Sequence, residues 1–280
     1  MRADDKVLAA LAELRTEDEG ELPSRAVLSE VTDHLIKALF PQRLGMAGGD
    51  VGAFVRRMLE SALGNLTGEV ATELAFQRRS GQTVVECDDL VGRFAESLPE
   101  IRVLLDSDIQ MAYRGDPAAR SVAEVLVCYP GIHAMVHHRI AHSLHRLGVP
   151  FVARVISELG RAETGIDIHP AASIGGGCFI DHGTGVVIGE TAILGDNVRL
   201  YQHVTLGAKK LDGVPKGMPR HPIVEDDVTI YSGATVLGRI TIGKGSVIGG
   251  GVWVTNDLPP GSFVTQARTQ VEAFTDGGGI

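Results

Sequence analysis

The sequence predicts an α+β chain in which an N-terminal helical domain is followed by a parallel β-solenoid. Of its 35 glycines, 13 fall in residues 1–160 and 22 in residues 161–280. Apolar residues recur at helical spacing in the first part, and aliphatic residues recur every six positions in the second. We therefore expect a helical domain over residues 1–160, a solenoid domain over residues 161–265 and a flexible tail over residues 266–280.

Composition and charge exclude several classes of protein. The chain is 44% hydrophobic and 22% charged, which is typical of a folded protein rather than a disordered one. A net charge of −9 argues against nucleic acid or an anionic membrane as the main partner. No run of apolar residues is long enough for a transmembrane helix. The three cysteines include no close pair, so we expect neither a disulfide framework nor a cysteine zinc site, and a cytoplasmic location.

Helical patterns fill the first domain. Residues 24–40 carry apolar positions at helical spacing, with Ser24 as N-cap and Pro41 as the stop. Residues 51–63 repeat the pattern and end at Gly64-Asn65. We expect further helices over residues 5–15, 68–79, 87–97, 98–113, 118–128, 131–147 and 150–160.

Five histidines cluster in one of these helices, and two interpretations of them stay open. His138 and His142 are four residues apart and share a helix face, so a metal site is conceivable. No carboxylate lies between the histidines and no HExxH motif is present, which favours ordinary surface or interface histidines. The five are His133, His137, His138, His142 and His145.

The second domain repeats every six residues. Short strands joined by tight turns fit this period, with the aliphatic side chains pointing inward. The period alone does not fix the handedness of the solenoid. The aliphatic positions are Ile168, Ile174, Ile180, Ile188, Leu194, Leu200, Leu206, Val224, Ile230, Val236, Ile242, Ile248 and Val254. Four residues later the side chain is often small or aliphatic, as at Ala172, Cys178, Thr184, Ala192, Val198, Ala234 and Val252.

The repeat breaks twice, and polar residues gather at the breaks. Between Ile180 and Ile188 one turn carries two extra residues. Between Leu206 and Val224 we expect residues 208–222 to form a loop ejected from the solenoid. A regular solenoid needs no such breaks, so they indicate a functional site.

The residues at these breaks suit acid–base chemistry on an alcohol. His182 lies in the first break and is a natural general base. Asp167 precedes it by fifteen residues, which places the two on adjacent coils near one edge, where the carboxylate would orient the imidazole. Arg220 follows the ejected loop and offers a planar fork for a carboxylate.

An ordered set of motifs covers roughly residues 22–265. The motifs are Asp108–Gln110, Asp116–Ala118, Gly131–Ala134, Asp167–Ala172, Asp181–Gly185, Ile188–Thr191, Val204–Gly207 and Arg220–Pro222. Together they resemble the serine O-acetyltransferases, a family of hexapeptide-repeat acyltransferases. The resemblance implies a left-handed parallel β-helix and transfer of acetyl from acetyl-CoA to the L-serine hydroxyl, the first step of cysteine biosynthesis. Acetyl-CoA is then a co-substrate, with no permanently bound cofactor and no metal.

The same resemblance implies roles for individual residues. It implies that His182 is the catalytic base and Asp167 its dyad partner. It further implies that the serine ammonium and hydroxyl lie near Asp116 and Asp181, that the serine carboxylate is bound by Arg220 and His221, and that Glu190 lies near the active site. The implied CoA groove, between the prisms of a trimer, matches Gly207, Ala208, Ser232 and Gly250, although small residues also suit plain solenoid packing.

The resemblance implies a homotrimer or a hexamer built as a dimer of trimers. Lys209, Lys210 and Lys216 in the ejected loop are candidates for the CoA phosphates, with a solvated loop as the alternative. The loop is longer than is usual in the family. The family's Gly-x-Pro-Ala-Arg ending is replaced by Phe263–Arg268, which affects how CoA is enclosed.

Three other functions fit parts of the pattern. The acceptor could be another small hydroxyl or amino compound, such as an amino sugar. A solenoid carbonic anhydrase would use His182, His203 and His221 as zinc ligands. A non-catalytic scaffold would act through the tail alone.

The tail Asp276–Ile280 resembles the family segment that inserts a terminal isoleucine into O-acetylserine sulfhydrylase, although a disordered end is the alternative. We expect the full chain to capture the sulfhydrylase in a pulldown and a variant lacking Ile280 to lose that capture. Equal capture by both chains would refute the role of the tail.

Overall fold

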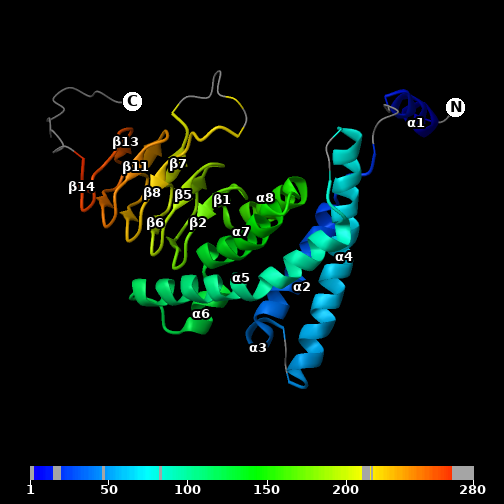
Figure 1. The fold of residues 1–280 in the computed structure, drawn as a ribbon, viewed down its shortest axis with the longest axis horizontal. Helices are drawn as coiled ribbons and strands as arrows, with labels where there is room; N and C mark the ends of the chain where they lie inside the picture. Colours follow the sequence, from blue (N-terminus) through cyan, green and yellow to red (C-terminus); the bar gives the residue numbers. More distant parts are fainter. Residues whose placement is uncertain are drawn as a thin grey trace.

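The computed structural model describes residues 3–14, 20–45, 48–81, 84–209, 215 and 217–266, and Figure 1 shows a helical part joined to a solenoid. Lys210, Lys216 and the tail Asp276–Ile280 lie outside the described residues. The helices are α1 (Ala3–Glu13), α2 (Arg25–Leu39), α3 (Pro41–Leu44), α4 (Val51–Arg79), α5 (Cys87–Gly115), α6 (Val122–Cys128), α7 (Pro130–Arg146) and α8 (Pro150–Thr164).

In two places, a pair of helices predicted as separate forms one continuous helix. The predicted helices over residues 51–63 and 68–79 form α4, which continues through Gly64 because Leu66 and Val70 extend its buried stripe. The predicted helices over 87–97 and 98–113 form α5, which continues through Pro99. Tertiary packing on both sides of these residues outweighs their low helix propensity. The N-cap was predicted correctly, since the Ser24 side chain accepts a hydrogen bond from Val27 N.

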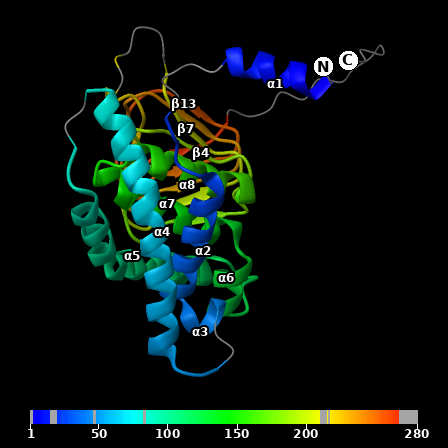
Figure 2. The same ribbon diagram turned by 90° about the vertical axis from the view of Figure 1, so that its right-hand side faces the viewer.

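The helices cover the first coil of the solenoid. Figure 2 shows α2 beside α4, with α7 and α8 between this pair and the strands. Helices α5 and α7 contact β3, and α8 contacts β1. None of the described helices combines the length and the apolar character needed to cross a membrane.

The solenoid is a three-sided prism of short parallel strands. Successive strands pass to the next sheet, and each strand pairs with the strands one coil before and after it. All thirteen aliphatic positions of the predicted repeat are buried. The sheets are β1 (Asp167–Ile168), β4 (Val187–Ile188), β7 (Thr205–Gly207), β10 (Thr235–Leu237) and β13 (Trp253–Val254); β2 (Ser173–Ile174), β5 (Ile193–Leu194), β8 (Ile223–Val224) and β11 (Thr241–Ile242); and β3 (Phe179–Asp181), β6 (Arg199–Tyr201), β9 (Thr229–Ile230), β12 (Val247–Ile248) and β14 (Phe263–Val264).

The turns between the sheets form three edges, which we name after a residue in each. The His182 edge comprises residues 182–186, 202–204, 231–234 and 249–252. The His221 edge comprises residues 169–172, 189–192, 238–240 and the described part of the predicted loop, namely residues 208–209, 215 and 217–222. The Gly177 edge comprises residues 175–178, 195–198, 225–228 and 243–246.

One position of the predicted repeat was wrong. Thr184 was assigned to the small inward position, but it is exposed and Val186 is buried in its place. The two extra residues of this turn move the inward position along the chain. The turn therefore projects more residues outward than a regular one.

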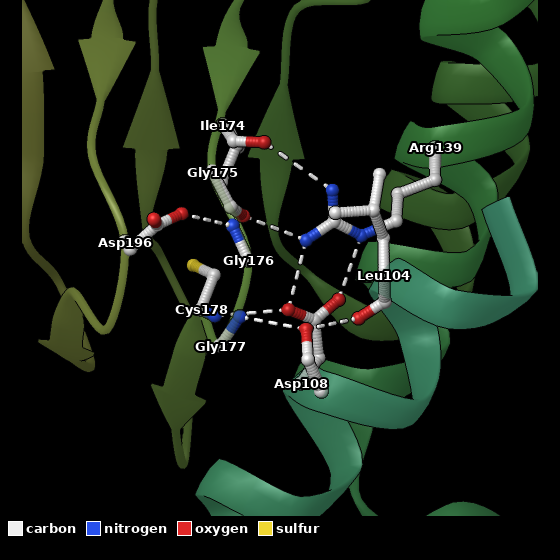
Figure 3. A network of polar contacts seen from close by, with 10 residues as sticks. Leu104, Asp108, Arg139, Ile174, Gly175, Gly176, Gly177, Cys178 and Asp196 are labelled. Atoms are coloured by element: carbon white, nitrogen blue, oxygen red, sulfur yellow. Dashed lines mark hydrogen bonds and ion pairs between the residues drawn. The ribbon is translucent and has the colours of Figure 1, made fainter. Parts of the chain in front are cut away.

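A buried ion pair joins the helices to the Gly177 edge (Figure 3). Arg139 on α7 donates from Nε to Asp108 Oδ2 at 2.7 Å and from Nη2 to Asp108 Oδ1 at 2.8 Å. Asp108 on α5 also accepts from Cys178 N at 2.9 Å. The guanidinium donates further to the carbonyls of Ile174 at 3.2 Å and Gly175 at 2.8 Å. The two charges thus contact two helices and one turn of the first coil.

The histidines of α7 are more buried than a surface role predicts. His137 is 7% exposed and His138 is 2% exposed. Burial lowers the pKa of His137, of His142 and, most strongly, of His138. The described residues contain no group of three or more side chains suited to hold a metal ion.

Removing the buried carboxylate should destabilise the fold far more than removing an exposed one on the same helix. Asp108→Asn leaves Arg139 buried without its ionic partner, and we expect the free energy of unfolding to fall by about 3–5 kcal/mol. Asp106→Asn breaks an exposed pair with Arg102 and should cost about 1 kcal/mol or less. Urea unfolding at one protein concentration measures both, and equal losses would contradict the role of Asp108.

The α7 histidines should make the fold sensitive to mild acid. Their native pKa values lie below the ordinary value of 6.5, so the unfolded chain binds more protons as the pH falls below 6.5. The stability that depends on neutral imidazoles is complete above that pH and is lost on acidification. We expect a lower urea midpoint at pH 5.5 than at pH 7.5, and a smaller difference in His138→Gln. A midpoint unchanged between the two pH values would contradict this.

Candidate active site

The predicted site residues separate into two groups on different edges of the prism. His182 and Asp181 lie at the His182 edge. The pKa of Asp116, which follows α5, is lowered chiefly by a hydrogen bond from Tyr129, with smaller contributions that include Arg199 and His182 of this edge. Glu190, Arg220 and His221 lie at the His221 edge. The sheet that contains β4 separates the two edges. One protomer therefore presents two half-sites.

His182 lies in a strained three-residue turn. Its φ is +59°, and Gly183 N donates to Asp181 O at 2.7 Å across it. The imidazole is 71% exposed. Gly185 has a φ of +75°, and a Cβ there would lie 2.3 Å from His203 Nδ1 on the next coil. The break predicted from the sequence thus forms a tight turn that projects the imidazole into solvent.

Two carboxylates lie near this imidazole. Asp181 Oδ1 is 3.8 Å from His182 Nε2, and Arg199 Nη2 donates to the other oxygen, Oδ2, at 2.7 Å. Asp116 accepts from the Tyr129 hydroxyl at 2.5 Å, which holds the pKa of Asp116 below its usual value. The same hydrogen bond raises the pKa of Tyr129 to about 12, so the phenol remains a donor.

Asp167 lies on the same side of the prism as His182, but its carboxylate is paired with Arg161. It begins β1, which pairs with β4, and Gly185 N donates to Gly165 O at 2.9 Å. Its carboxylate is 3.7 Å from Arg161 Nε. The carboxylate within ion-pair distance of His182 in the described residues is that of Asp181.

Thr191 organises the His221 edge and was not among the residues predicted for the site. Its Oγ1 accepts from Arg220 N at 2.8 Å and His221 N at 3.1 Å. Its own amide and hydroxyl approach His221 Nδ1 at 3.0 and 2.9 Å. Because the amide can only donate, Nδ1 is an acceptor and Nε2 carries the proton. Its position after Glu190 in the predicted motif was the available signal.

The charges at this edge are fixed by a second ion pair. Arg220 Nη2 contacts Glu190 Oε2 at 2.5 Å. Burial raises the pKa of Glu190, but the Arg220 hydrogen bond and charge outweigh it and hold the pKa below its usual value. Burial lowers the pKa of His221, and it lowers that of His169 to about 4. Arg220 keeps further N–H groups for an anionic ligand.

The residues predicted to bind CoA divide in the same way. Gly207 ends β7 and Ala208 begins the ejected loop, whereas Ser232 and Gly250 lie at the His182 edge. Two cavities of about 380 and 450 Å³ are lined mainly by the helices, and neither is lined by His182 or His221.

The histidines of the predicted zinc alternative lie at two different edges of one protomer. His203 lies on the coil after that of His182, and a hydrogen bond of 2.8 Å from His203 N to Thr184 O joins the two turns. His221 lies at the other edge. The three histidines do not converge on one point within a single protomer.

Comparison with known proteins gives one consistent result. A family model described as bacterial transferase hexapeptide (six repeats) matches residues 221–256. The chain is 48% identical over 275 residues to the plasmid serine acetyltransferase of Synechococcus elongatus, covering 92% of this chain and 86% of that protein. It is 52% identical over 161 residues to the serine acetyltransferase of Bacillus pumilus, covering 58% and 72% of the two chains.

Solved structures agree with the sequence matches. Serine acetyltransferase isoform 3 of Entamoeba histolytica, in complex with cysteine, gives a TM-score of 0.78 at 33% identity, covering 93% of this chain and 87% of that one. Soybean serine acetyltransferase complexed with serine gives a TM-score of 0.57 at 31% identity, covering 86% and 96%.

Proposed function

The chain belongs to the serine acetyltransferase family, and on that premise we propose that His182 is the general base that activates the hydroxyl of L-serine. The observation that carries this proposal is the turn at residue 182, which exposes an imidazole beside two carboxylates. The family uses acetyl-CoA as co-substrate. Positioned proton transfer of this kind contributes about 10²–10⁴-fold in rate.

In the proposed reaction one proton moves from the serine hydroxyl to His182 and then to the CoA thiolate. His182 removes the proton from the serine hydroxyl as the oxygen attacks the thioester carbonyl of acetyl-CoA. The tetrahedral intermediate collapses with cleavage of the carbon–sulfur bond. The imidazolium then returns the proton to the CoA thiolate, giving O-acetyl-L-serine and free CoA. Asp167, on the same edge, is proposed to stabilise the imidazolium, with Asp181 as the nearer carboxylate.

The charges of the two half-sites match the two ends of serine. Asp116 and Asp181 supply negative charge for the ammonium group beside His182. Arg220 and the Nε2–H of His221 supply donors for the carboxylate. A zwitterion held at both ends therefore fits better than an uncharged sugar. Cysteine carries the same two end groups, so we expect it to compete for them.

The separation of the half-sites supports an active site shared between protomers. In a ring of three, the His182 edge of one prism meets the His221 edge of the next, so each of the three sites is built from two subunits. The same contact brings Ser232 and Gly250 opposite Gly207 and Ala208 of the neighbour, which provides a groove for CoA. Pairing of two trimers into a hexamer, and capture of the sulfhydrylase by the tail, remain predictions.

Mixing two inactive variants tests both the base and the shared site. His182→Ala and Arg220→Ala should each lose most activity in a thiol-release assay with acetyl-CoA and L-serine. In trimers that contain both variants, one interface keeps an intact His182 and an intact Arg220, so about one third of the wild-type rate should return.

The mixed trimers are obtained by co-expression with two tags and tandem purification. Trimers mixed from His182→Ala and His182→Gln serve as the control and should stay inactive. Near-normal turnover by His182→Ala would refute the base. Absence of recovery in the mixed trimers, with both single variants inactive, would refute the shared site.

A further inference from the structure

Arg199 occupies a position between the helical part and the His182 edge that no step above uses. It begins β6 and lies one coil above Phe179, with which it is in register. Its guanidinium carbon is 4.8 Å from the ring centroids of both Phe179 and Tyr201. Its side chain is 22% exposed, and its Nε is buried with no hydrogen-bond partner. The cation is thus held by two aromatic rings rather than by solvent.

The guanidinium connects the two carboxylates of this edge. Nη2 donates to Asp181 Oδ2 at 2.7 Å, which leaves Oδ1 directed to His182 at 3.8 Å. A Cβ at Gly115 would lie 3.7 Å from Arg199 Nη1, so the end of α5 passes beside the cation. Asp116 is the next residue, and the Arg199 charge contributes to the low pKa of its carboxyl.

We propose that Arg199 is a positioning residue that fixes the orientation of Asp181 and offsets one of the two negative charges beside His182. This inference rests on His182 being the base. Without Arg199, two carboxylates would favour the imidazolium, and a protonated imidazole cannot accept the serine proton. The planar, always charged guanidinium suits the task because it stacks between rings while it donates to a carboxylate.

Other ionisable groups face the same edge and are unchanged by a substitution at Arg199. They include the phenol that donates to Asp116, the stacked pair of tyrosine rings, the histidine of the next coil, and the Asp167–Arg161 pair. These are Tyr129, Tyr201, Tyr231, His203, Asp167 and Arg161.

Two substitutions separate the charge from the geometry. In Arg199→Met the acid limb of the pH profile of kcat/KM for serine should move to higher pH by about one unit, since a cation has been removed near the base. On the acid limb, below the pKa of the base in both chains, this lowers kcat/KM about tenfold, while the KM for acetyl-CoA stays within about twofold. Arg199→Lys keeps the charge but loses the fork, so its acid limb should stay in place while kcat/KM falls about threefold or more.

Arg102→Met is the matched control. Arg102 also lies over an aromatic ring, 4.2 Å from the Phe40 centroid, and pairs with an aspartate, Asp106, at 2.9 Å, but it is on α5 in the helical part. Its pH profile should equal that of the unmodified chain. In an Asp181→Asn background, Arg199→Met should produce a smaller shift, because one of the two carboxylates beside the base is no longer charged.

The outcomes distinguish this inference from the proposed base. Loss of activity in His182→Ala together with an unshifted profile in Arg199→Met would overturn the role of Arg199 alone. Near-normal activity in His182→Ala would overturn the base and the inference with it. Should Arg199→Met fail to assemble, an unchanged kcat/KM in Arg199→Lys would refute the positioning role.

Discussion

The contact between Asp108 and Arg139 fixes the first coil of the solenoid, and every later coil stacks on that one. The pair is almost excluded from water, so each charge needs its partners in place. Those partners come from α5, α7 and residues 174–178, which cannot shift independently without leaving a charge uncompensated. The same contact therefore sets the distance from the end of α5, where Asp116 lies, to β3, where Asp181 and the turn of His182 begin.

The two edges differ in charge, and this difference supports the proposed active site shared between protomers. The His182 edge carries Asp116 and Asp181 close to the imidazole, and the His221 edge carries Arg220 and donors aligned by Thr191. Unlike edges attract, whereas a contact between two like edges would place carboxylates against carboxylates. A head-to-tail ring satisfies this preference at every interface. A small zwitterion between the edges would neutralise both of them.

Much of the fold was predictable because a hexapeptide period leaves a direct mark on the sequence. Every aliphatic position of the repeat is buried, and the break at His182 forms an unusual turn. Helix ends were less predictable, since Gly64 and Pro99 break helices in isolation but lie between buried turns here. The roles of Thr191 and Arg199 were not predictable, because each depends on contacts between coils that the sequence separates by 18 to 30 residues.

The coils of the prism follow one another in chain order, starting from the helical part. Each coil pairs with its two neighbours alone, and the helices that cover the first coil precede it in the chain. During synthesis the helical part would therefore fold before the first strand leaves the ribosome. Each new coil of about 18 residues could then pack on the structure already formed. Contacts distant in sequence would not have to wait for the end of synthesis. Because His182 precedes Arg220 in the chain, the turn that carries His182 would dock before the coil that carries Arg220.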